Sequence, residues 1–280
     1  MRAFRFGVSL LSVDDRFVAK CRRLEELGYD VVTVPDHLGA PAPFPALAAA
    51  AVATSRLHVG PMVLNVPFYN PVLLARDIES TSAVAGGRFE LGVGAGHMKA
   101  EFDDAGLPWW PARKRIAYLE STLDELRKRL DPLPPLLIAG HSDGVLSLAA
   151  EQADTIGFAG LKQAPGRPPG SFHLAGVDEL AERVGFVRER GVDPEFNLLV
   201  QRVVVAENPR PELQDWLSRI PDAPQTVDDL LATPQVLAGT VPQIVDTLLE
   251  RRERFGFSYV TVFEPFLEDF APVARALSGR

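Results

Sequence analysis

Residues 86–97 read GGRFELGVGAGH, and this stretch decides the fold. The apolar run at 89–93 predicts a short buried strand. Glycines directly after a strand let the backbone come very close to a group at the strand's end. We therefore expect a functional loop here. It consists of two glycines, an alanine and a histidine: Gly94, Ala95, Gly96 and His97.

A glycine loop after a strand also suggests the dinucleotide-binding fingerprint G-x-G-x-x-G. Here the spacing is G-x-G-x-G, and His97 stands where the third glycine should be. That motif also requires an acidic residue at the end of a second strand about twenty positions later, and this sequence has none there. The glycines therefore need another explanation.

The composition narrows the class of protein. With 280 residues, of which 46% are hydrophobic, the chain can bury a large core. Its formal net charge of −8 argues against a nucleic-acid partner. One cysteine, Cys21, excludes an internal disulfide, and no apolar run is long enough to cross a membrane. We expect a cytoplasmic protein with a small-molecule substrate and no membrane partner.

Short apolar segments alternate with amphipathic ones along the whole chain. This alternation predicts a parallel sheet covered by helices, and eight such units indicate a (β/α)8 TIM barrel. We expect a single domain over 1–280, with short insertions after strands six and seven. The eight predicted strands are 4–10, 31–34, 57–64, 89–93, 136–139, 155–158, 196–205 and 259–262.

Three helix starts carry capping signals. Ser12 with Asp15 resembles a capping pair, and Asn70 before a proline is a favourable N-cap. Thr240 with Gln243 forms a capping box. These positions predict where three of the helices begin.

In barrels of this kind, functional loops follow the carboxyl ends of the strands. That rule brings together Asp36 and His37, the segment around Asn65, the glycine loop, and the segment 140–143. Asp36 and His37 combine a carboxylate with a group that titrates near neutral pH, as general acid-base catalysis requires. The alternative is a loop histidine beside an aspartate that makes a turn.

Two other parts of this predicted site also have two interpretations. His97 either faces the ligand of the glycine loop or packs in the loop. Gly140, His141 and Ser142 stand before a helix, whose N–H groups and positive dipole end suit a phosphate. Ser142 or Asp143 could instead cap that helix. The spacing of His, Asp and Glu predicts no metal site.

The connection that follows the glycine loop is aromatic and basic. Trp109 and Trp110 either line a pocket mouth or cover the barrel rim. Arg113, Lys114 and Arg115 oppose the dipole of the helix that they begin, which suggests either an anionic ligand or a solvated basic turn.

Four segments together resemble the luciferase-like monooxygenase superfamily, most closely its oxidoreductases that use the deazaflavin coenzyme F420. The resemblance covers nearly the whole chain and keeps the order of the motifs. The segments are GYDVVTVPDHL, LHVGPMVLNVPFYNPVLLARDIESTSAVAGGRFELGVGAGH, PPLLIAGHSDGVLSLAAEQADTIGFAG and LAGTVPQIVDTLLERRERFGFSYVTVFE.

The resemblance implies a flavin or deazaflavin at the carboxyl ends of the strands. In the family a bulge in strand three, often with a non-proline cis peptide, supports the ring from behind. The glycine loop lies beside the ring, and the segment that matches Gly140 and His141 receives the cofactor phosphate. The implied cofactor-binding residues are Asp36, Met62, Val63, Asn65, Gly94, Ala95, Gly96, Gly140, His141 and Ser142.

The resemblance also assigns catalytic roles. His37 matches the histidine that acts as a base in the sugar-phosphate dehydrogenases of this superfamily. Those enzymes carry an acidic glutamate where this chain has His97, and many relatives carry a tryptophan there. We expect His37 to act as acid and base, and His97 to be a second polar group over the ring.

The predicted function is therefore an F420-dependent oxidoreductase that moves a hydride between the cofactor and a small organic substrate. One alternative is a monooxygenase of the same fold that uses FMN. Another is a barrel that has lost catalysis. An exposed face of the barrel would allow a homodimer.

Overall fold

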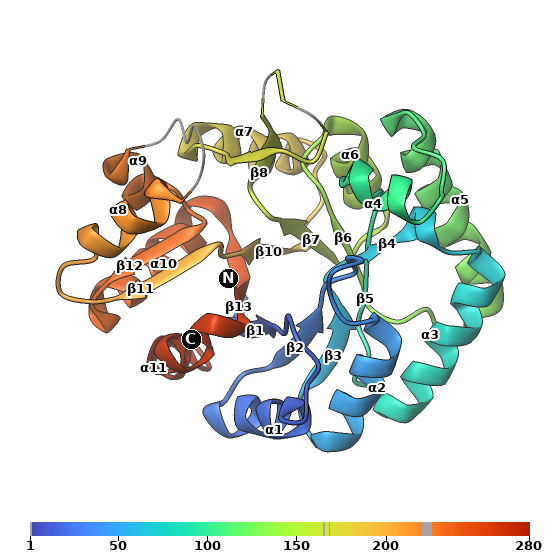
Figure 1. Ribbon diagram of the computed structural model, residues 1–280, viewed down its shortest axis with the longest axis horizontal. Coiled ribbons are helices and arrows are strands. Elements are labelled where there is room, and N and C mark those ends of the chain that lie inside the picture. The colour runs from blue at the N-terminus through green and yellow to red at the C-terminus, as the bar shows by residue number, and fades with distance from the viewer. Residues whose placement is uncertain (1, 165, 168, 220–225) are drawn as a thin grey trace.

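A computed structural model describes residues 2–164, 166–167, 169–219 and 226–280. Parallel strands form a barrel, seen along its axis in Figure 1, and helices surround it. The strands of this sheet are β1 (Arg5–Ser9), β2 (Val31–Val34), β3 (His58–Pro61), β4 (Leu64–Asn65), β5 (Leu91–Gly94), β6 (Leu136–Ala139), β7 (Thr155–Phe158), β10 (Glu195–Leu199) and β13 (Phe257–Phe263).

The sheet order is β3-β2-β1-β13-β10-β7-β6-β5-β4. Strands β3 and β4 occupy one position of the barrel, because β3 pairs with β2 while β4 pairs with β5. A parallel bridge between Val59 and Phe89 joins β3 to the chain just before β5 and closes the circle. The (β/α)8 barrel predicted from the sequence is confirmed, with its third strand in two pieces.

The interruption of the third strand falls at Met62 and Val63. The peptide bond between these two residues is cis, which is the feature that the family resemblance implies at this place. The sequence predicted one continuous strand over 57–64, and that prediction is wrong at these two residues. By contrast, β2, β6 and β7 have the predicted bounds.

Helices cover the outside of the barrel, and their apolar sides pack on the sheet to form the main core. The cap at Asn70 is confirmed: its side chain accepts hydrogen bonds from the N–H groups of Val72 and Leu73. The capping box of Thr240 and Gln243 is confirmed as well. The helices are α1 (Phe17–Leu27), α2 (Pro43–Ala53), α3 (Pro71–Ala85), α4 (Lys99–Asp104), α5 (Ala112–Arg129), α6 (Asp143–Gln152), α7 (Val177–Arg188), α8 (Arg210–Ser218), α9 (Val227–Ala232), α10 (Val241–Phe255) and α11 (Leu267–Leu277).

The predicted capping pair of Ser12 and Asp15 is wrong. Helix α1 begins at Phe17 with Arg16 at its N-cap position and no side-chain cap. The Ser12 hydroxyl donates instead to Glu264, at 3.1 Å, in the segment after the last barrel strand. A contact distant in sequence therefore outweighs the local capping signal.

Insertions follow the sixth and seventh barrel strands, as predicted. The first contains an antiparallel hairpin of β8 (Leu161–Gln163) and β9 (Phe172–Leu174). In the second, β11 (Arg202–Val205) pairs in parallel with β12 (Val236–Gly239) outside the barrel. The prediction of one strand over 196–205 is wrong, because the chain leaves the barrel after β10.

An ion-pair cluster closes the amino-terminal end of the barrel. Arg5 donates from Nη2 to both carboxylate oxygens of Glu90, at 3.0 and 2.8 Å, and its guanidinium lies over the Tyr259 ring. Burial alone would raise the pKa of Glu90, but hydrogen bonds from His58 and Arg5 hold it below its usual value. This end of the barrel serves packing and stability, so the functional site belongs at the other end.

Among the residues that the structure describes, no helix is long and apolar enough to span a membrane.

Candidate functional site

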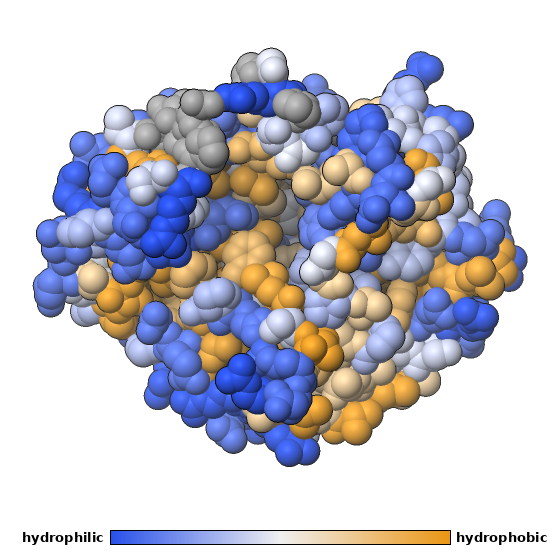
Figure 2. Space-filling view, in the orientation of Figure 1, coloured by the Kyte–Doolittle hydropathy of each residue, from blue (hydrophilic) through white to orange (hydrophobic). Residues whose placement is uncertain are grey.

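The carboxyl ends of the barrel strands surround a hollow at the centre of the face shown in Figure 2. Apolar side chains line much of this hollow in that view. Three half-buried residues form the bottom of the site: Met62, Val63 and Ala139. They pack on buried side chains of the barrel interior. The loops after β2, β5 and β6 rise around it.

His37 and His97 meet at this end of the barrel. Their ring centroids lie 5.3 Å apart with an interplanar angle of 89°. On its other side His97 contacts Phe172 of the β8–β9 hairpin, at 5.2 Å between centroids. The structure thus brings together the two histidines that the sequence singled out, and adds an aromatic side chain from the first insertion.

His97 is held in its neutral form. Its ring is accessible to solvent, yet it lies in a concave site surrounded by protein atoms. This desolvation, with smaller contributions from the nearby His37 and Arg115, lowers the pKa of His97 to about 4. At neutral pH His97 can therefore both donate and accept a hydrogen bond without carrying charge.

His37 has a carboxylate partner that was not among the residues expected at the site. Its Nδ1 lies 2.8 Å from Oε1 of Glu101, which is on the short helix α4. The only sequence signal was a glutamate four residues after His97, at the start of a helix.

Asp36 fixes the loop that carries His37. Its Oδ2 accepts a hydrogen bond from the Asn65 N–H at 2.8 Å, and the Tyr69 hydroxyl also donates to it. Burial raises the pKa of Asp36, and these two hydrogen bonds offset only part of the rise. The loops after β2 and β4 are thereby joined beside the site.

The glycines of the central stretch have a packing role inside the protein. A Cβ atom on Gly94 would lie 2.9 Å from Val63 Cγ2, and one on Gly96 would lie 2.4 Å from Asn65 Oδ1. Gly96 also has a positive φ of 75°. The interrupted third strand approaches β5 so closely that these positions exclude any side chain. This requirement exists whether or not a ligand lies beside the loop.

Arg115 supports the glycine loop from behind. Its Nε donates to the Ala95 carbonyl at 3.1 Å, its Nη1 donates to the Trp110 carbonyl, and its guanidinium lies 3.7 Å from the Trp109 ring centroid. Burial lowers the pKa of Arg115. The interpretation of 113–115 as one solvated basic turn is therefore wrong for Arg115, which is buried.

The segment before α6 opens onto a surface groove of about 690 Å³. Ser142 occupies the N-cap position, but its side chain makes no capping bond. Backbone hydrogen bonds of α6 begin with the N–H of Leu146, which donates to the Ser142 carbonyl. The earlier N–H groups at this helix end are available to an anion.

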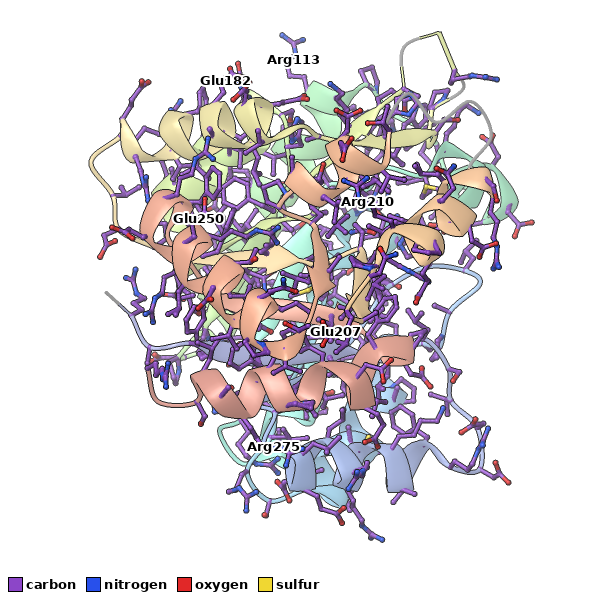
Figure 3. The ribbon with its side chains drawn as sticks, turned by 90° about the vertical axis from the view of Figure 1, so that its left-hand side faces the viewer. Arg113, Glu182, Glu207, Arg210, Glu250 and Arg275 are labelled. Carbon is purple, nitrogen blue, oxygen red and sulfur yellow. The ribbon has the colours of Figure 1, made fainter. Side chains whose placement is uncertain are left out.

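Charged side chains also line this groove. Arg113 and Glu182 lie on its rim (Figure 3), and Arg113 has no ion-pair partner within the described ranges. Arg183 is paired with Asp143 and Glu182. The open helix end and the unpaired Arg113 fit a phosphate, and the half-buried apolar bottom of the hollow fits a planar ring.

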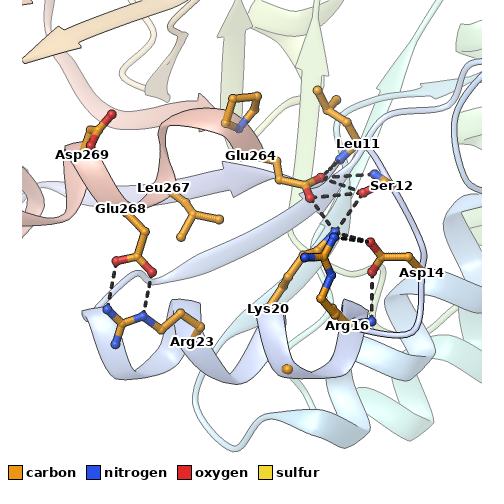
Figure 4. Close-up of a pocket in the computed structure, with 12 residues that line it drawn as sticks. Leu11, Ser12, Asp14, Arg16, Lys20, Arg23, Glu264, Leu267, Glu268 and Asp269 are labelled. Carbon is orange, nitrogen blue, oxygen red and sulfur yellow. Dashed lines mark hydrogen bonds and ion pairs between the residues drawn. The ribbon is translucent and has the colours of Figure 1, made fainter.

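A second groove, also of about 690 Å³, lies between α1 and the start of α11. Figure 4 shows that most of its charged side chains pair with one another, whereas Asp269 has no pair among the residues drawn. Lys20 contacts Glu264 at 2.6 Å, and Arg23 contacts Glu268 at 2.7 Å. These pairs leave little charge to recognise a ligand.

The family model for the luciferase-like monooxygenases matches residues 12–221. The chain belongs to this family. One relative, the F420-dependent glucose-6-phosphate dehydrogenase of Kribbella flavida, is 38% identical over 114 residues. That match covers 38% of this chain and 34% of the relative, so this chain aligns with about a third of the relative's length.

Two solved structures of luciferase-like barrels share the whole fold. An F420-dependent secondary alcohol dehydrogenase in complex with an F420-acetone adduct has a TM-score of 0.76 at 16% identity, covering 99% of each chain. A riboflavin lyase with modified FMN has a TM-score of 0.71 at 14% identity, covering 99% of this chain and 93% of the other. At these identities the matches establish the fold alone.

The described part of this luciferase-like chain contains no cluster of His, Cys, Asp and Glu that could hold a metal ion. The histidines and the helix end could be predicted from the sequence, whereas the site roles of Glu101, Arg115, Phe172 and Tyr69 could not. Tyr69 follows Asn65 by four residues, but its hydrogen bond to Asp36 depends on how the two loops meet. Phe172 reaches the site from the β8–β9 hairpin, which is distant in sequence.

Proposed function

We propose that this protein is an oxidoreductase that uses F420 and transfers a hydride between that cofactor and a small organic substrate. One observation carries the proposal: the open helix end at Ser142 lies at the same end of the barrel as His37 and His97. A phosphate site and a pair of titratable groups at one barrel end are what a phosphorylated redox cofactor and its substrate need. The named F420-dependent relative supports F420 as the cofactor.

In this proposal the backbone N–H groups at His141 and Ser142 hold the cofactor phosphate, with Arg113 on the groove rim adding positive charge. The N–H of Gly140, which the family resemblance also implied, donates to the Gly157 carbonyl at 3.2 Å instead. Met62 and Val63 support the ring at the bottom of the hollow. F420, when bound, supplies a carbon that accepts or releases a hydride. The protein's own task is to position the reactants and to move a proton.

His37 is the proposed proton acceptor and donor. When an alcohol is oxidised, its C–H hydrogen leaves as a hydride and its O–H proton passes to the imidazole of His37. In the reverse direction the imidazolium returns that proton to the carbonyl oxygen. Neutral His97 hydrogen-bonds to the same oxygen without adding charge.

FMN is the second candidate cofactor, because it also carries a phosphate and a planar ring. The structural match to a riboflavin lyase with modified FMN is the reason to test FMN as well. An FMN-dependent monooxygenase would need oxygen, whereas the proposed reaction would not.

The proposed reaction is tested under anaerobic conditions, by following the absorbance of oxidised F420. Reduced F420 is mixed with a panel of small ketones and enones, and oxidised F420 with small alcohols, each with and without the protein. We expect protein-dependent oxidation or reduction of F420 with at least one compound class. The proposal is overturned if F420 is unchanged throughout while reduced FMN and oxygen support turnover.

A further inference from the structure

The contact between Glu101 and His37 connects α4 with the loop after β2. Nδ1 of His37 and Oε1 of Glu101 are 2.8 Å apart. The Glu101 side chain is only 16% exposed, while that of His37 is 38% exposed. A carboxylate this well shielded holds its partner more firmly than a surface pair would.

This geometry decides which nitrogen of His37 carries hydrogen. An ionised carboxylate only accepts hydrogen bonds, so Nδ1 must donate to it. In the neutral ring Nε2 is then the acceptor. We propose that Glu101 is a positioning residue that keeps His37 in the Nδ1–H tautomer, so that Nε2 is the atom that exchanges a proton with the substrate.

Glu101 is itself held in place. The next residue, Phe102, is fully buried and packs against Phe68 and Trp109, with ring centroids 5.1 and 4.9 Å away. A Cβ atom on Gly96 would lie 2.9 Å from the Phe102 ring, so the glycine loop leaves room for this packing. The carboxylate of Glu101 is therefore anchored by the same loop that carries His97.

The second oxygen of Glu101, Oε2, is buried and has no hydrogen-bond partner among the described residues. Within the described residues, no other protein donor therefore shares the negative charge of Glu101 through this oxygen. When His37 takes up a proton, the resulting imidazolium lies directly against this carboxylate. The hydrogen bond at Nδ1 thus holds the ring in the same position whether or not Nε2 carries a proton.

No other nearby group among the described residues is placed to accept the hydrogen bond from Nδ1 of His37. Asp36 is adjacent in sequence, but its carboxylate is bonded to Asn65 and Tyr69. His97 contacts the His37 ring and is neutral at physiological pH. Glu101 is thus the carboxylate that the structure pairs with His37.

The tautomer is measured directly by NMR on the apo-protein with ¹⁵N-labelled histidine, at about pH 9, where histidine side chains are neutral. We expect His37, assigned from the spectrum of His37→Ala, to be protonated at Nδ1 in the wild type. Glu101→Ala should shift His37 toward the Nε2–H form. Glu101→Gln should keep the Nδ1–H form, since its amide oxygen still accepts a hydrogen bond.

Turnover provides the second measurement, and this part rests on the proposed function. We expect kcat to fall about 10-fold in Glu101→Gln and about 100-fold in Glu101→Ala, with the cofactor Kd within a few-fold. Asp104→Ala, which removes an exposed carboxylate of the same helix, is the control and should leave kcat unchanged.

The proposal is overturned if the His37 tautomer in Glu101→Ala is the same as in the wild type, or if both Glu101 variants turn over at the wild-type rate. Failure of the proposed function would look different: F420 would not bind, while the NMR measurement would still show whether Glu101 controls the tautomer.

Discussion

The rings of His37 and His97 lie 5.3 Å apart at nearly a right angle, so two loops of the barrel meet through these side chains. His37 is tied to the carboxylate of Glu101, whereas His97 is held neutral by its surroundings. Two histidines in contact thus have different electrostatic surroundings. The predictions below start from this difference.

His37→Ala should lower kcat about 100-fold or more, because it removes the proposed proton acceptor. The cofactor Kd should stay within a few-fold, since the proposed phosphate site lies on another loop. Steady-state kinetics and a binding titration measure the two effects. His58→Ala, at the opposite end of the barrel, is the control, and a near-normal kcat in His37→Ala would rule out the catalytic role.

His97 should make stability depend on pH. An unfolded chain protonates this histidine below about pH 6.5, whereas the folded protein keeps it neutral down to about pH 4. Between these values the unfolded state binds more protons, so the free energy of unfolding falls as the pH falls. In His97→Asn this contribution is absent.

Urea unfolding at about pH 7 and about pH 5 tests this linkage. The wild type should lose more stability between the two conditions than His97→Asn does. If both proteins lose the same amount, the His97 pKa is not lowered in the folded state.

Gly96→Ala should destabilise the protein by about 3 kcal/mol, since its backbone φ is positive and the new Cβ would collide with Asn65 and Phe102. Gly86→Ala is a matched control: its φ is also positive, at 60°, but its Cβ would meet no atom within 4 Å. We expect a loss of about 1 kcal/mol there. Equal losses in chemical denaturation would show that Gly96 is not required for close packing.

Arg113→Glu should weaken F420 binding about 10-fold at low salt, because it places a negative charge on the rim of the groove proposed to hold the phosphate. Binding of the deazaflavin riboside, which lacks the phosphate, should be unaffected. Arg275→Glu is the control, and Figure 3 shows it far from Arg113. Equal weakening with the riboside would mean that Arg113 does not act through the phosphate.

We also propose a homodimer through α2 and α3, which pack side by side. Helix α2 has no polar side chain, and four large apolar residues are exposed on the two helices: Val52, Val72, Leu73 and Val84. Charged side chains on α3, such as the exposed Arg76, would border this apolar surface, and an apolar surface can face its own copy without repulsion. Val52→Glu should therefore shift sedimentation from dimer to monomer, and a wild-type protein that sediments as a monomer would exclude this interface.

The barrel could be predicted from the sequence because its strands are short apolar runs with clear ends. The bounds of β2, β6 and β7 follow from such runs alone. The prediction of one strand over 196–205 was wrong because the apolar pattern continues past the end of β10. There the chain leaves the barrel, and β11 pairs with β12. Local pattern carries no information about which sheet a strand joins.

Part of the candidate site could be predicted from the sequence as well. His37 and His97 were found because each follows a strand, and parallel strands bring their carboxyl ends together. Glu101 and Arg115 were missed as site residues because their roles depend on which loop each side chain reaches. For the glycines, the sequence suggested a ligand, whereas the structure shows close contact with Val63 and Asn65.

The most direct test of the central claim is an anaerobic titration of the purified protein with F420 and, separately, with FMN, followed by fluorescence. We predict saturable binding of F420 that is at least about tenfold tighter than binding of FMN and is weakened by Arg113→Glu. Tight binding of FMN with weak or absent binding of F420 would contradict the account.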